Sequence, residues 1–424
     1  MKRVAAALLL MLLAGVVVGC DGDDTVEPVA SSSCAQILYE GDGEPDVIVV
    51  SDFPRRGIGA ESTSLMIDAI EFVLREREFR AGEYRVGYQS CNDTQGDEPF
   101  DPVLCKRNAR DYVATEDVVG MIGPWNSGCA IDQIPIVSRK AAGPLAMISP
   151  SNTFLGLTRS APGESGSGDA LYPDGIRSYL RVITHDVAQG IAAAHLAERQ
   201  GARRVAVLQQ DELDLSYARG LTVPFVDSAR SLGLEVVQFD WPVRESYATL
   251  AASVAEAHPD AVFLAGLTQG NARRLLTDLR AALGPDVTLI GPDSFAAADI
   301  AQELGAAGEG MRVTSPGVAP EELPPAGQRF LREFLPAPTN PFYAPETAQA
   351  TEVLLDAIAR SDGTRASVVD ELFRTKVTNG ILGSFSFDPY GDIVPAPVSI
   401  LRVEGGELVA EDVIRAPLDQ LQGS

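Results

Sequence analysis

Alternation between short apolar runs and longer amphipathic segments is the feature that most constrains the fold of this chain. The runs DVIVVS (46–51), YRVGYQ (84–89) and VVGMIG (118–123) are rich in β-branched residues and almost continuously apolar. The segment 61–76 follows the first run, and its apolar side chains recur with helical spacing. Such strands, alternating with helices, indicate parallel sheets covered by helices on both faces.

The same pattern starts a second time further along the chain. RRVAVLQQ (203–210), AVFLAG (261–266) and VTLIGP (287–292) alternate with helices predicted near 216–233 and 271–283. A chain of 424 residues is too long for one ordinary core. The sequence therefore predicts an α/β fold with two Rossmann-like lobes, each built on a parallel central sheet. Ligands of such sheets bind beyond the carboxyl ends of the strands, where helix N termini expose N–H groups.

Composition and charge exclude some classes of protein. Hydrophobic residues make up 45% of the chain and charged residues 22%, which is typical of a globular protein. The net charge of −25 argues against a nucleic-acid partner, because little basic surface is available to neutralise phosphates.

The N terminus has the pattern of an export signal. Lys2 and Arg3 precede an apolar run that is short for a membrane span and typical of a signal peptide. The run ends in VVGC, and small residues directly before Cys20 are similar to the lipobox of bacterial lipoproteins. We predict a signal peptide over 1–19, lipidation of Cys20, and a flexible tether over 20–43. The alternative is an ordinary cleaved signal peptide with an incidental cysteine. Either way the protein is exported; lipidation would anchor it to the cell membrane, facing the periplasm or the cell exterior.

Polar residues follow two neighbouring predicted strands of the first block. Ser127 lies in GPWNSGC after the third strand, and Thr153 lies in SPSNTFLGLT after the fourth. Either hydroxyl could bind a carboxylate beside free backbone N–H groups, or could cap a helix. Their matching positions on adjacent strands favour a carboxylate site. Trp125 and Asn126 are predicted walls of the same cleft, with lobe packing as the alternative for Trp125.

The second block offers an acid at a matching place. Asp293 follows the strand in LIGPDSF, and Tyr217 lies in DELDLSYARG at the start of a predicted helix. Helix capping is the alternative role for Asp293, and packing is the alternative for Tyr217. Together with the first lobe, these residues predict a cleft for a zwitterion, with its α-carboxylate on lobe one and its α-ammonium on lobe two.

Motifs of catalysis and cofactor binding are not found in the sequence. GIGAES (57–62) lacks the last glycine of a dinucleotide fingerprint, and no phosphate-binding P-loop occurs. GESGSG (163–168) is not a nucleophile elbow. The three histidines are scattered and the cysteines do not have CxxC spacing, so we predict no metal site, no cofactor and no enzyme activity.

The string VVGMIGPWNSGCA…PLAMISPSNTFLGLT resembles the type I periplasmic solute-binding proteins, specifically the branched-chain amino-acid (leucine/isoleucine/valine) binding family. YARGL, LIGPDSF, AGEGMRVTSP and FDPYGD follow in that family's order, so the resemblance runs from about 46 to about 401. It implies that Ser127 and Thr153 bind the ligand α-carboxylate. It also implies that the Ser151 carbonyl and Asp293 hold the ammonium group, and that Tyr217 contacts the ligand from lobe two.

The chain departs from the family pattern around the ligand side chain. The aromatic residue expected after the first strand is not evident, and Arg55 and Arg56 stand in that region. AGLTQGN replaces the tyrosine-rich edge after the seventh strand. Recognition of the amino-acid head group is therefore better supported by the sequence than an aliphatic pocket for the ligand side chain. Contact of Arg55 or Arg56 with the ligand is a hypothesis, and solvation of these arginines is its alternative.

The resemblance also implies a hinge of three strands between the lobes. Crossings are expected near 179–184, 310–316 and 383–392. Lobe one then combines 44–180 with 314–383, and lobe two combines 183–312 with 384–424. Closure about these strands would bury the ligand and create the surface that a transporter recognises.

Four cysteines remain in the exported chain after Cys20, and an even number favours two disulfides. The short loop between Cys91 and Cys105 favours pairing of these two, which leaves Cys34 to pair with Cys129. The pairing of Cys91 with Cys129 remains an open alternative.

These observations predict a solute-binding lipoprotein of an ABC transporter, which captures an amino acid or a similar small polar solute for the permease subunits. The protein is expected to be a monomer, held at the membrane by its lipid anchor. The alternative is a ligand-sensing domain of the same fold that reports to a signalling partner. A hydrolase on an α/β sheet is the third hypothesis, but the sequence contains no nucleophile elbow to support it.

Overall fold

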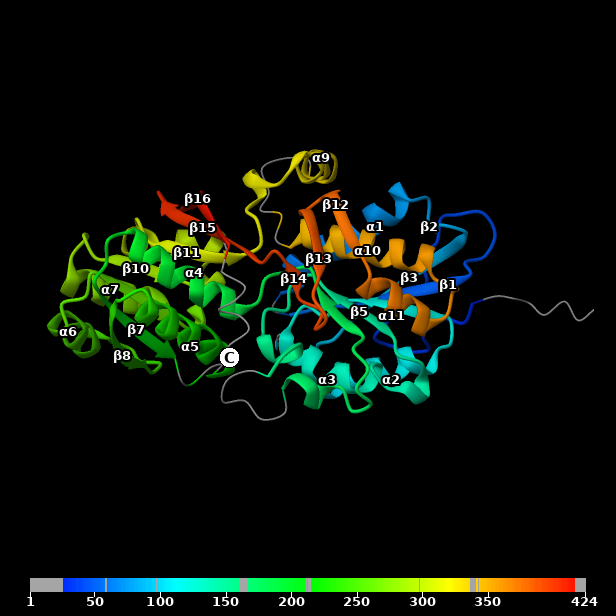
Figure 1. Cartoon of the computed structure of the whole chain (residues 1–424), viewed down its shortest axis with the longest axis horizontal. Coiled ribbons are helices and arrows are strands. Elements are labelled where there is room, and N and C mark those ends of the chain that lie inside the picture. Colours follow the sequence, from blue (N-terminus) through cyan, green and yellow to red (C-terminus); the bar gives the residue numbers. More distant parts are fainter. Residues whose placement is uncertain are drawn as a thin grey trace, which may run out of the picture.

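The computed structural model describes residues 26–57, 59–96, 98, 100–160, 167–210, 212, 215–296, 298–335, 341 and 343–415. Two α/β lobes lie side by side, and each is built on its own sheet (Figure 1). This architecture confirms the predicted fold class.

The sheet of lobe one has six strands in the order β2-β3-β1-β4-β5-β6, parallel except for β2 at its edge. Alternate residues of β1 point to opposite faces: Val47 and Val49 join one apolar core, and Ile48 and Val50 join another. Helices α1, α10 and α11 cover the first face, and α2 and α3 cover the second (Figure 1). The bounds are β1 (Val47–Asp52), β2 (Arg80–Ala81), β3 (Tyr84–Cys91), β4 (Val118–Ile122), β5 (Ala146–Ser149), β6 (Tyr179–Arg181), α1 (Ala60–Glu76), α2 (Pro102–Ala114), α3 (Ser127–Val137), α10 (Ala344–Arg360) and α11 (Arg365–Phe373).

The sheet of lobe two has seven strands in the order β16-β15-β11-β10-β9-β7-β8. The five strands from β11 to β8 are parallel, and β15 and β16 add antiparallel strands at one edge. Helices α4 and α5 pack on one face of this sheet, and α6, α7 and α8 pack on the other. The bounds are β7 (Arg204–Gln210), β8 (Glu235–Trp241), β9 (Ala261–Ala265), β10 (Thr288–Gly291), β11 (Arg312–Pro316), β15 (Pro397–Glu404), β16 (Glu407–Arg415), α4 (Asp186–Arg199), α5 (Leu215–Ser231), α6 (Ala248–Glu256), α7 (Ala272–Leu283) and α8 (Ala298–Leu304).

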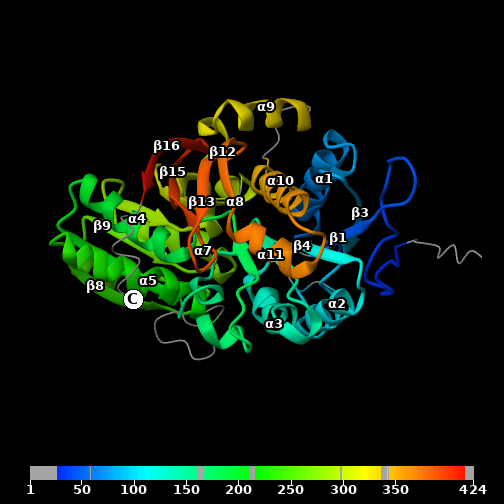
Figure 2. The same ribbon diagram turned by 45° about the vertical axis from the view of Figure 1, so that its right-hand side comes forward.

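A small antiparallel sheet of three strands lies beside the hinge: β12 (Lys376–Gly380), β13 (Gly383–Phe387) and β14 (Ile393–Val394). Its buried side chains belong to the core of lobe one. Helix α9 (Pro325–Phe334) lies at the outer edge, above β12 and α10 in both views (Figures 1 and 2). Short helical turns complete the chain at η1 (Lys140–Ala142), η2 (Leu155–Leu157), η3 (Gly168–Leu171), η4 (Thr268–Gly270), η5 (Asp293–Phe295), η6 (Gly305–Ala307) and η7 (Pro320–Glu322).

Three segments connect the lobes, and the third begins later in the chain than the sequence predicted. The chain leaves the first sheet after β6, leaves the second after β11, and enters β15 directly after β14. The predicted third crossing at 383–392 contains all of β13, which packs with lobe one. Local periodicity did not distinguish a crossing strand from this small sheet, because both are short extended segments.

The predicted tether is wrong for the part of it that the structure describes, from Val26 to Gly43. Val29 is buried, and its backbone N–H donates to the Gln89 side chain at 2.8 Å. Ala35 and Leu38 donate backbone hydrogen bonds to the carbonyls of Ser90 and Tyr88 on β3. This segment therefore extends the edge of the first sheet. The predicted signal peptide and Cys20 lie outside the described residues, and no helix in the described part has the length and hydropathy needed to cross a bilayer.

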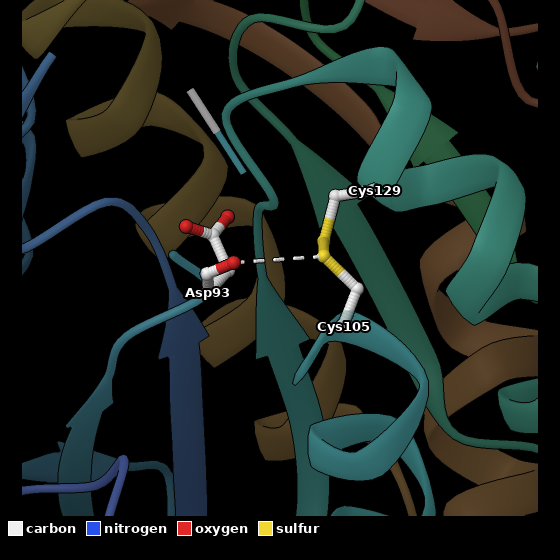
Figure 3. A group of neighbouring side chains, drawn as sticks. All are labelled: Asp93, Cys105 and Cys129. Atoms are coloured by element: carbon white, nitrogen blue, oxygen red, sulfur yellow. Dashed lines mark hydrogen bonds between the residues drawn. A yellow bond between two sulfur atoms is a disulfide. The ribbon is translucent and has the colours of Figure 1, made fainter. Parts of the chain in front are cut away.

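The predicted disulfide pairing is also wrong. Cys34 pairs with Cys91. Cys105 pairs with Cys129 (Figure 3). Cys34 lies opposite Cys91 in an antiparallel bridge because its segment runs along β3. Cys105 and Cys129 lie on α2 and α3, which pack side by side on the same face of the sheet. The prediction depended on the short loop between Cys91 and Cys105, and the length of that loop gives no information about contact between α2 and α3.

Peptide mapping under non-reducing conditions checks the pairing. We expect linked peptides that contain Cys34 with Cys91 and Cys105 with Cys129, because each pair lies on adjacent elements. A linked peptide of Cys91 with Cys105 would contradict this arrangement.

Candidate functional site

The edge of lobe one begins where β4 ends and α3 starts. Asn126 is the N-cap of α3, and its side chain accepts a hydrogen bond from the Gly128 N–H at 2.7 Å. Capping is thus done by Asn126 and not by Ser127. The Ser127 hydroxyl accepts a long hydrogen bond of 3.4 Å from the Phe154 N–H, and its own hydrogen has no acceptor among the described residues.

The next loop, after β5, lies against this edge. Ser151 Oγ donates to the Trp125 carbonyl at 3.0 Å, which ties the two loops together. Thr153 is buried, and its carbonyl accepts a hydrogen bond from the Asp186 N–H at 2.9 Å. Its hydroxyl makes no hydrogen bond with another described residue. Ser127 and Thr153 therefore both retain a hydroxyl donor at the same edge.

On lobe two, Asp293 and Tyr217 are in direct contact. Asp293 Oδ1 accepts hydrogen bonds from the Tyr217 hydroxyl at 2.6 Å and from Gln189 Nε2 at 3.1 Å. Burial raises the pKa of Asp293, and these two hydrogen bonds oppose the rise. Burial and the Asp293 charge raise the pKa of Tyr217 well above its usual value, so its hydroxyl remains a donor at neutral pH. The result is a carboxylate whose nearby partners are neutral donors.

Gln189 is a residue that the sequence reasoning missed. Its amide nitrogen also donates to Asp186 Oδ1 at 3.3 Å, and its oxygen accepts from the Thr314 hydroxyl at 3.2 Å. Hydrogen bonds thus run from the Thr153 carbonyl through Asp186 and Gln189 to Asp293, which links the two edges across the start of α4. The signal was the spacing of Asp186 and Gln189, three residues apart on one helix face directly after the first crossing.

Tyr343 was also missed. It precedes α10 in a left-handed backbone conformation with φ of 34°. Burial and the negative charges of Asp293, Glu346 and Asp186 raise its pKa well above the usual value. This lobe-one residue therefore lies within electrostatic reach of the acids of lobe two.

The other predicted cleft residues have structural roles as well. Trp125 is half-buried against the core of lobe one, and a Cβ added at Gly59 would lie 2.9 Å from its ring. Arg55 and Arg56 are exposed. The Arg55 N–H donates to Asn92 Oδ1 at 2.7 Å and its guanidinium donates to the Ser90 carbonyl at 3.3 Å, so Arg55 is held at the edge of β3. Contact of these residues with a ligand stays a prediction.

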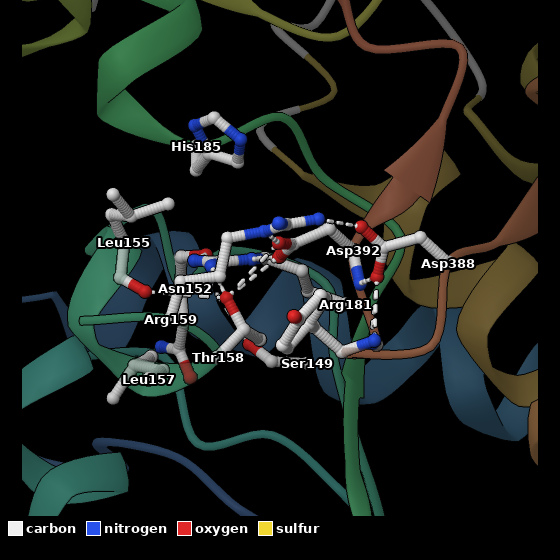
Figure 4. Close-up of polar contacts among 12 residues, drawn as sticks. Ser149, Asn152, Leu155, Leu157, Thr158, Arg159, Arg181, His185, Asp388 and Asp392 are labelled. Atoms are coloured by element: carbon white, nitrogen blue, oxygen red, sulfur yellow. Dashed lines mark hydrogen bonds and ion pairs between the residues drawn. The ribbon is translucent and has the colours of Figure 1, made fainter. Parts of the chain in front are cut away.

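A buried ion pair supports the loop that carries Thr153 (Figure 4). Arg181, at the end of β6, is 0% exposed, and its Nε donates to Asp392 Oδ1 at 2.7 Å. Its Nη1 donates to the carbonyls of Asn152 and Phe154 at 3.1 and 2.8 Å, on either side of Thr153. Arg181 therefore joins the candidate carboxylate edge to the segment that precedes the third crossing.

The charges of this pair are maintained by their surroundings. Burial alone would raise the pKa of Asp392, but Arg181, with smaller effects from His185 and Arg159, lowers it to about 2. Burial lowers the pKa of His185 to about 4, so this histidine is neutral at physiological pH. Arg159 forms ion pairs with both Asp388 and Asp392. Asp392 is thus ionised across the physiological pH range, and the positive charges of its arginine partners balance its negative charge.

One cluster of described residues, Asp93 with Cys105 and Cys129, brings three potential metal-ligand atoms together (Figure 3). The two sulfurs are joined in a disulfide and so cannot act as thiolate ligands. Asp93 is fully buried, and neither of its carboxylate oxygens has a hydrogen-bond partner among the described residues. Burial raises the pKa of the nearby Asp52 to about 7, and burial together with the Asp52 charge raises that of Asp93 well above its usual value.

These raised pKa values predict a stability that falls as pH rises, because the folded state holds protons that the unfolded state has already released. Asp93→Asn is neutral at every pH, so we expect it to increase the free energy of unfolding by about 2 kcal/mol near pH 8 and by less near pH 5. Urea denaturation at both pH values measures this, with the exposed Asp240→Asn as control. An Asp93→Asn protein less stable than wild type near pH 8 would contradict the expectation.

Comparison with known proteins places this geometry in a family. A model described as periplasmic binding protein matches residues 92–407. A search of curated proteins gives no significant match. Among solved structures, a leucine-binding protein LivK from Thermotoga maritima is 23% identical with a TM-score of 0.71, covering 88% of this chain and 99% of that one.

Two further structures show the breadth of the likeness. LivJ from Streptococcus pneumoniae, in complex with isoleucine, is 19% identical with a TM-score of 0.68, over 87% of this chain and 99% of that one. A solute-binding protein from R. palustris, in complex with benzoate, is 17% identical with a TM-score of 0.66, over 87% and 96% of the two chains. Identities this low establish the shared fold and not the ligand.

The family match covers most of the chain and agrees with the resemblance inferred from the strand-end motifs. It confirms the type I periplasmic binding fold and a binding protein in place of an enzyme, and it implies a location outside the cytoplasm. The chain belongs to the periplasmic binding protein family.

Proposed function

We propose that this protein is an extracytoplasmic solute-binding lipoprotein of an ABC transporter and that it captures an α-amino acid between its two lobes. The observation that carries the proposal is the contrast between the two polar edges. Ser127 and Thr153 retain hydroxyl donors on lobe one, and Asp293 is an acid with neutral partners on lobe two. These edges suit the opposite charges of a zwitterion.

The chemistry of each edge is specific. The first turn of α3 points backbone N–H groups toward the Ser127 side, where a helix N terminus favours an anion. Asp293 accepts from Tyr217 and Gln189 through one oxygen, Oδ1, which leaves Oδ2 for an ammonium group. The Ser151 carbonyl is the further acceptor that we assign to the ammonium. No bond is made or broken, so binding and release are the whole function.

Benzoate and related aromatic acids are ligands of other proteins with this fold. Such an acid has no positively charged group to pair with Asp293, and its carboxylate would add a second negative charge to the cleft. The acid on lobe two therefore favours an amino acid over an aromatic acid.

Differential scanning fluorimetry tests the ligand class. A ligand that binds the folded state alone raises the melting temperature by mass action. We expect one or more common α-amino acids to raise it and benzoate to leave it unchanged. A shift with benzoate and none with any α-amino acid would overturn the proposal. Uptake of the identified amino acid by cells with and without the gene then separates transport from a sensing role.

Lipid anchoring is a prediction for residues outside the described part of the chain. Radioactive palmitate is expected to label the wild-type protein and not Cys20→Ser, because the thiol of Cys20 is the proposed attachment site. Cys34→Ser is the matched control and should retain the label, since Cys34 is not part of the lipobox. Labelling of the Cys20→Ser protein would refute the lipoprotein assignment.

A further inference from the structure

A cavity of about 310 Å³ lies at the hinge, apart from the candidate cleft. Residues of all three connections between the lobes line it, and none of Ser127, Thr153 and Asp293 does. Val182 lines it from the first connection, Gly317 from the second and Pro395 from the third, and the wall also includes Glu346. The volume suits a small organic molecule.

Among the described residues of the wall, Glu346 is a buried acid whose carboxyl group has no side-chain hydrogen-bond or ion-pair partner. It lies in the first turn of α10 and is 8% exposed. Its Oε1 lies beside Gly317, where an added Cβ would be 3.4 Å away. Within the described part of the chain, no other residue's side chain forms a hydrogen bond or an ion pair with this carboxyl group. Burial raises its pKa to about 7, and its own backbone N–H partly opposes the rise.

A buried carboxylate without a partner is costly, and a ligand that brings a positive group into the cavity would remove that cost. Val182, Phe385 and Ile393 are among the apolar residues that line the cavity, and Thr184 and Ser384 add two neutral hydroxyl-bearing side chains. The other charged groups that line the cavity are Glu322 and Arg415, and both are exposed to solvent. The complementary ligand therefore has one cationic group and an apolar body.

We propose that the hinge cavity binds a small organic cation, a primary ammonium group on an apolar body, with Glu346 as its counter-ion. This site is additional to the cleft in which the transported solute is proposed to bind. Because all three connections line the cavity, its shape changes when the lobes rotate, so its occupancy and lobe closure are linked.

Benzylamine is the probe, because it joins one ammonium group to an apolar ring, and benzyl alcohol is its neutral control. Isothermal titration calorimetry near pH 8 should detect benzylamine and not benzyl alcohol. Glu346→Gln should weaken benzylamine binding by about tenfold or more, since it removes a charge-assisted hydrogen bond. Glu322→Gln, at the exposed margin, should change it by less than about threefold.

The pH dependence of the wild-type protein tests the same point without a variant. Glu346 gains a proton as pH falls below about 7, so affinity for benzylamine should fall between about pH 8 and about pH 5.5. Tyr343, which precedes α10 and lies within electrostatic reach of Glu346, stays neutral across this pH range because burial raises its pKa.

Asp293→Asn separates this site from the cleft. Retention of benzylamine binding in Asp293→Asn and its loss in Glu346→Gln would support the hinge site. Loss in Asp293→Asn with retention in Glu346→Gln would place the probe in the cleft and overturn the inference. Absence of binding to the wild-type protein near pH 8, or an affinity that does not change with pH, would overturn it as well.

Discussion

Asp293→Asn is expected to lower the affinity for the amino-acid ligand by about 100-fold or more, because loss of one partner of a desolvated charge pair costs about 2–5 kcal/mol. Asp293 is the carboxylate assigned to the ammonium group, and its neighbours Tyr217 and Gln189 are neutral donors that cannot replace it. Isothermal titration calorimetry with the amino acid identified by fluorimetry measures the change. The amide is nearly isosteric, so the variant should fold.

Tyr217→Phe is the matched control for this experiment. It removes the 2.6 Å hydrogen bond to Asp293 but keeps the carboxylate, so its loss of affinity should be about tenfold or less. A loss in Asp293→Asn no larger than that in Tyr217→Phe would contradict the role of Asp293 as the counter-charge. The fluorimetric melting temperature of each unliganded variant shows whether a loss arises from unfolding.

The second large effect is expected for Arg181→Met, which should lower the free energy of unfolding by up to about 3–5 kcal/mol, because it removes the fully buried partner of Asp392 and leaves that carboxylate only its ion pair with the partly exposed Arg159. Arg181 also holds the carbonyls on both sides of Thr153, so the remaining folded protein should bind the amino acid more weakly. Urea denaturation and calorimetry measure the two effects.

Arg199→Met provides the control, since Arg199 pairs with Asp412 on the surface and both side chains are about half exposed. Exposed pairs contribute about 0–1 kcal/mol, so this variant should be close to wild type in stability. The double variant Arg181→Met with Asp392→Leu should recover part of the loss, because no uncompensated charge remains. Equal stability of Arg181→Met and Arg199→Met would show that the buried network does not support the fold.

The fold could be predicted from the sequence because its signals are local. The apolar run at 46–51 corresponds to β1 and the periodic segment 61–76 to α1, each within one residue at both ends. Strand ends in a parallel sheet share one edge, so Ser127 and Thr153 could be placed together before any contact was known. The hydrogen bond between Ser127 and the residue after Thr153 agrees with that placement.

The missed features depend on contacts between distant parts of the chain. The 26–43 segment is held by β3, and no local pattern of its polar residues predicts that Cys34 pairs with a strand residue 57 positions further along the chain. Cys105 and Cys129 meet because two helices pack on one face, which spacing does not reveal. Gln189 is one of many polar residues on helices, and its role became evident only with Asp293 at 3.1 Å.

Calorimetric titration of the identified amino acid and its two single-charge analogues tests the central claim most directly. One analogue lacks the amino group and the other lacks the carboxylate. If Ser127, Thr153 and Asp293 form a clamp for a zwitterion, each analogue should bind at least about 100-fold more weakly than the amino acid itself. An analogue that binds as tightly as the amino acid would contradict the claim and show that one of the two edges does not hold the ligand.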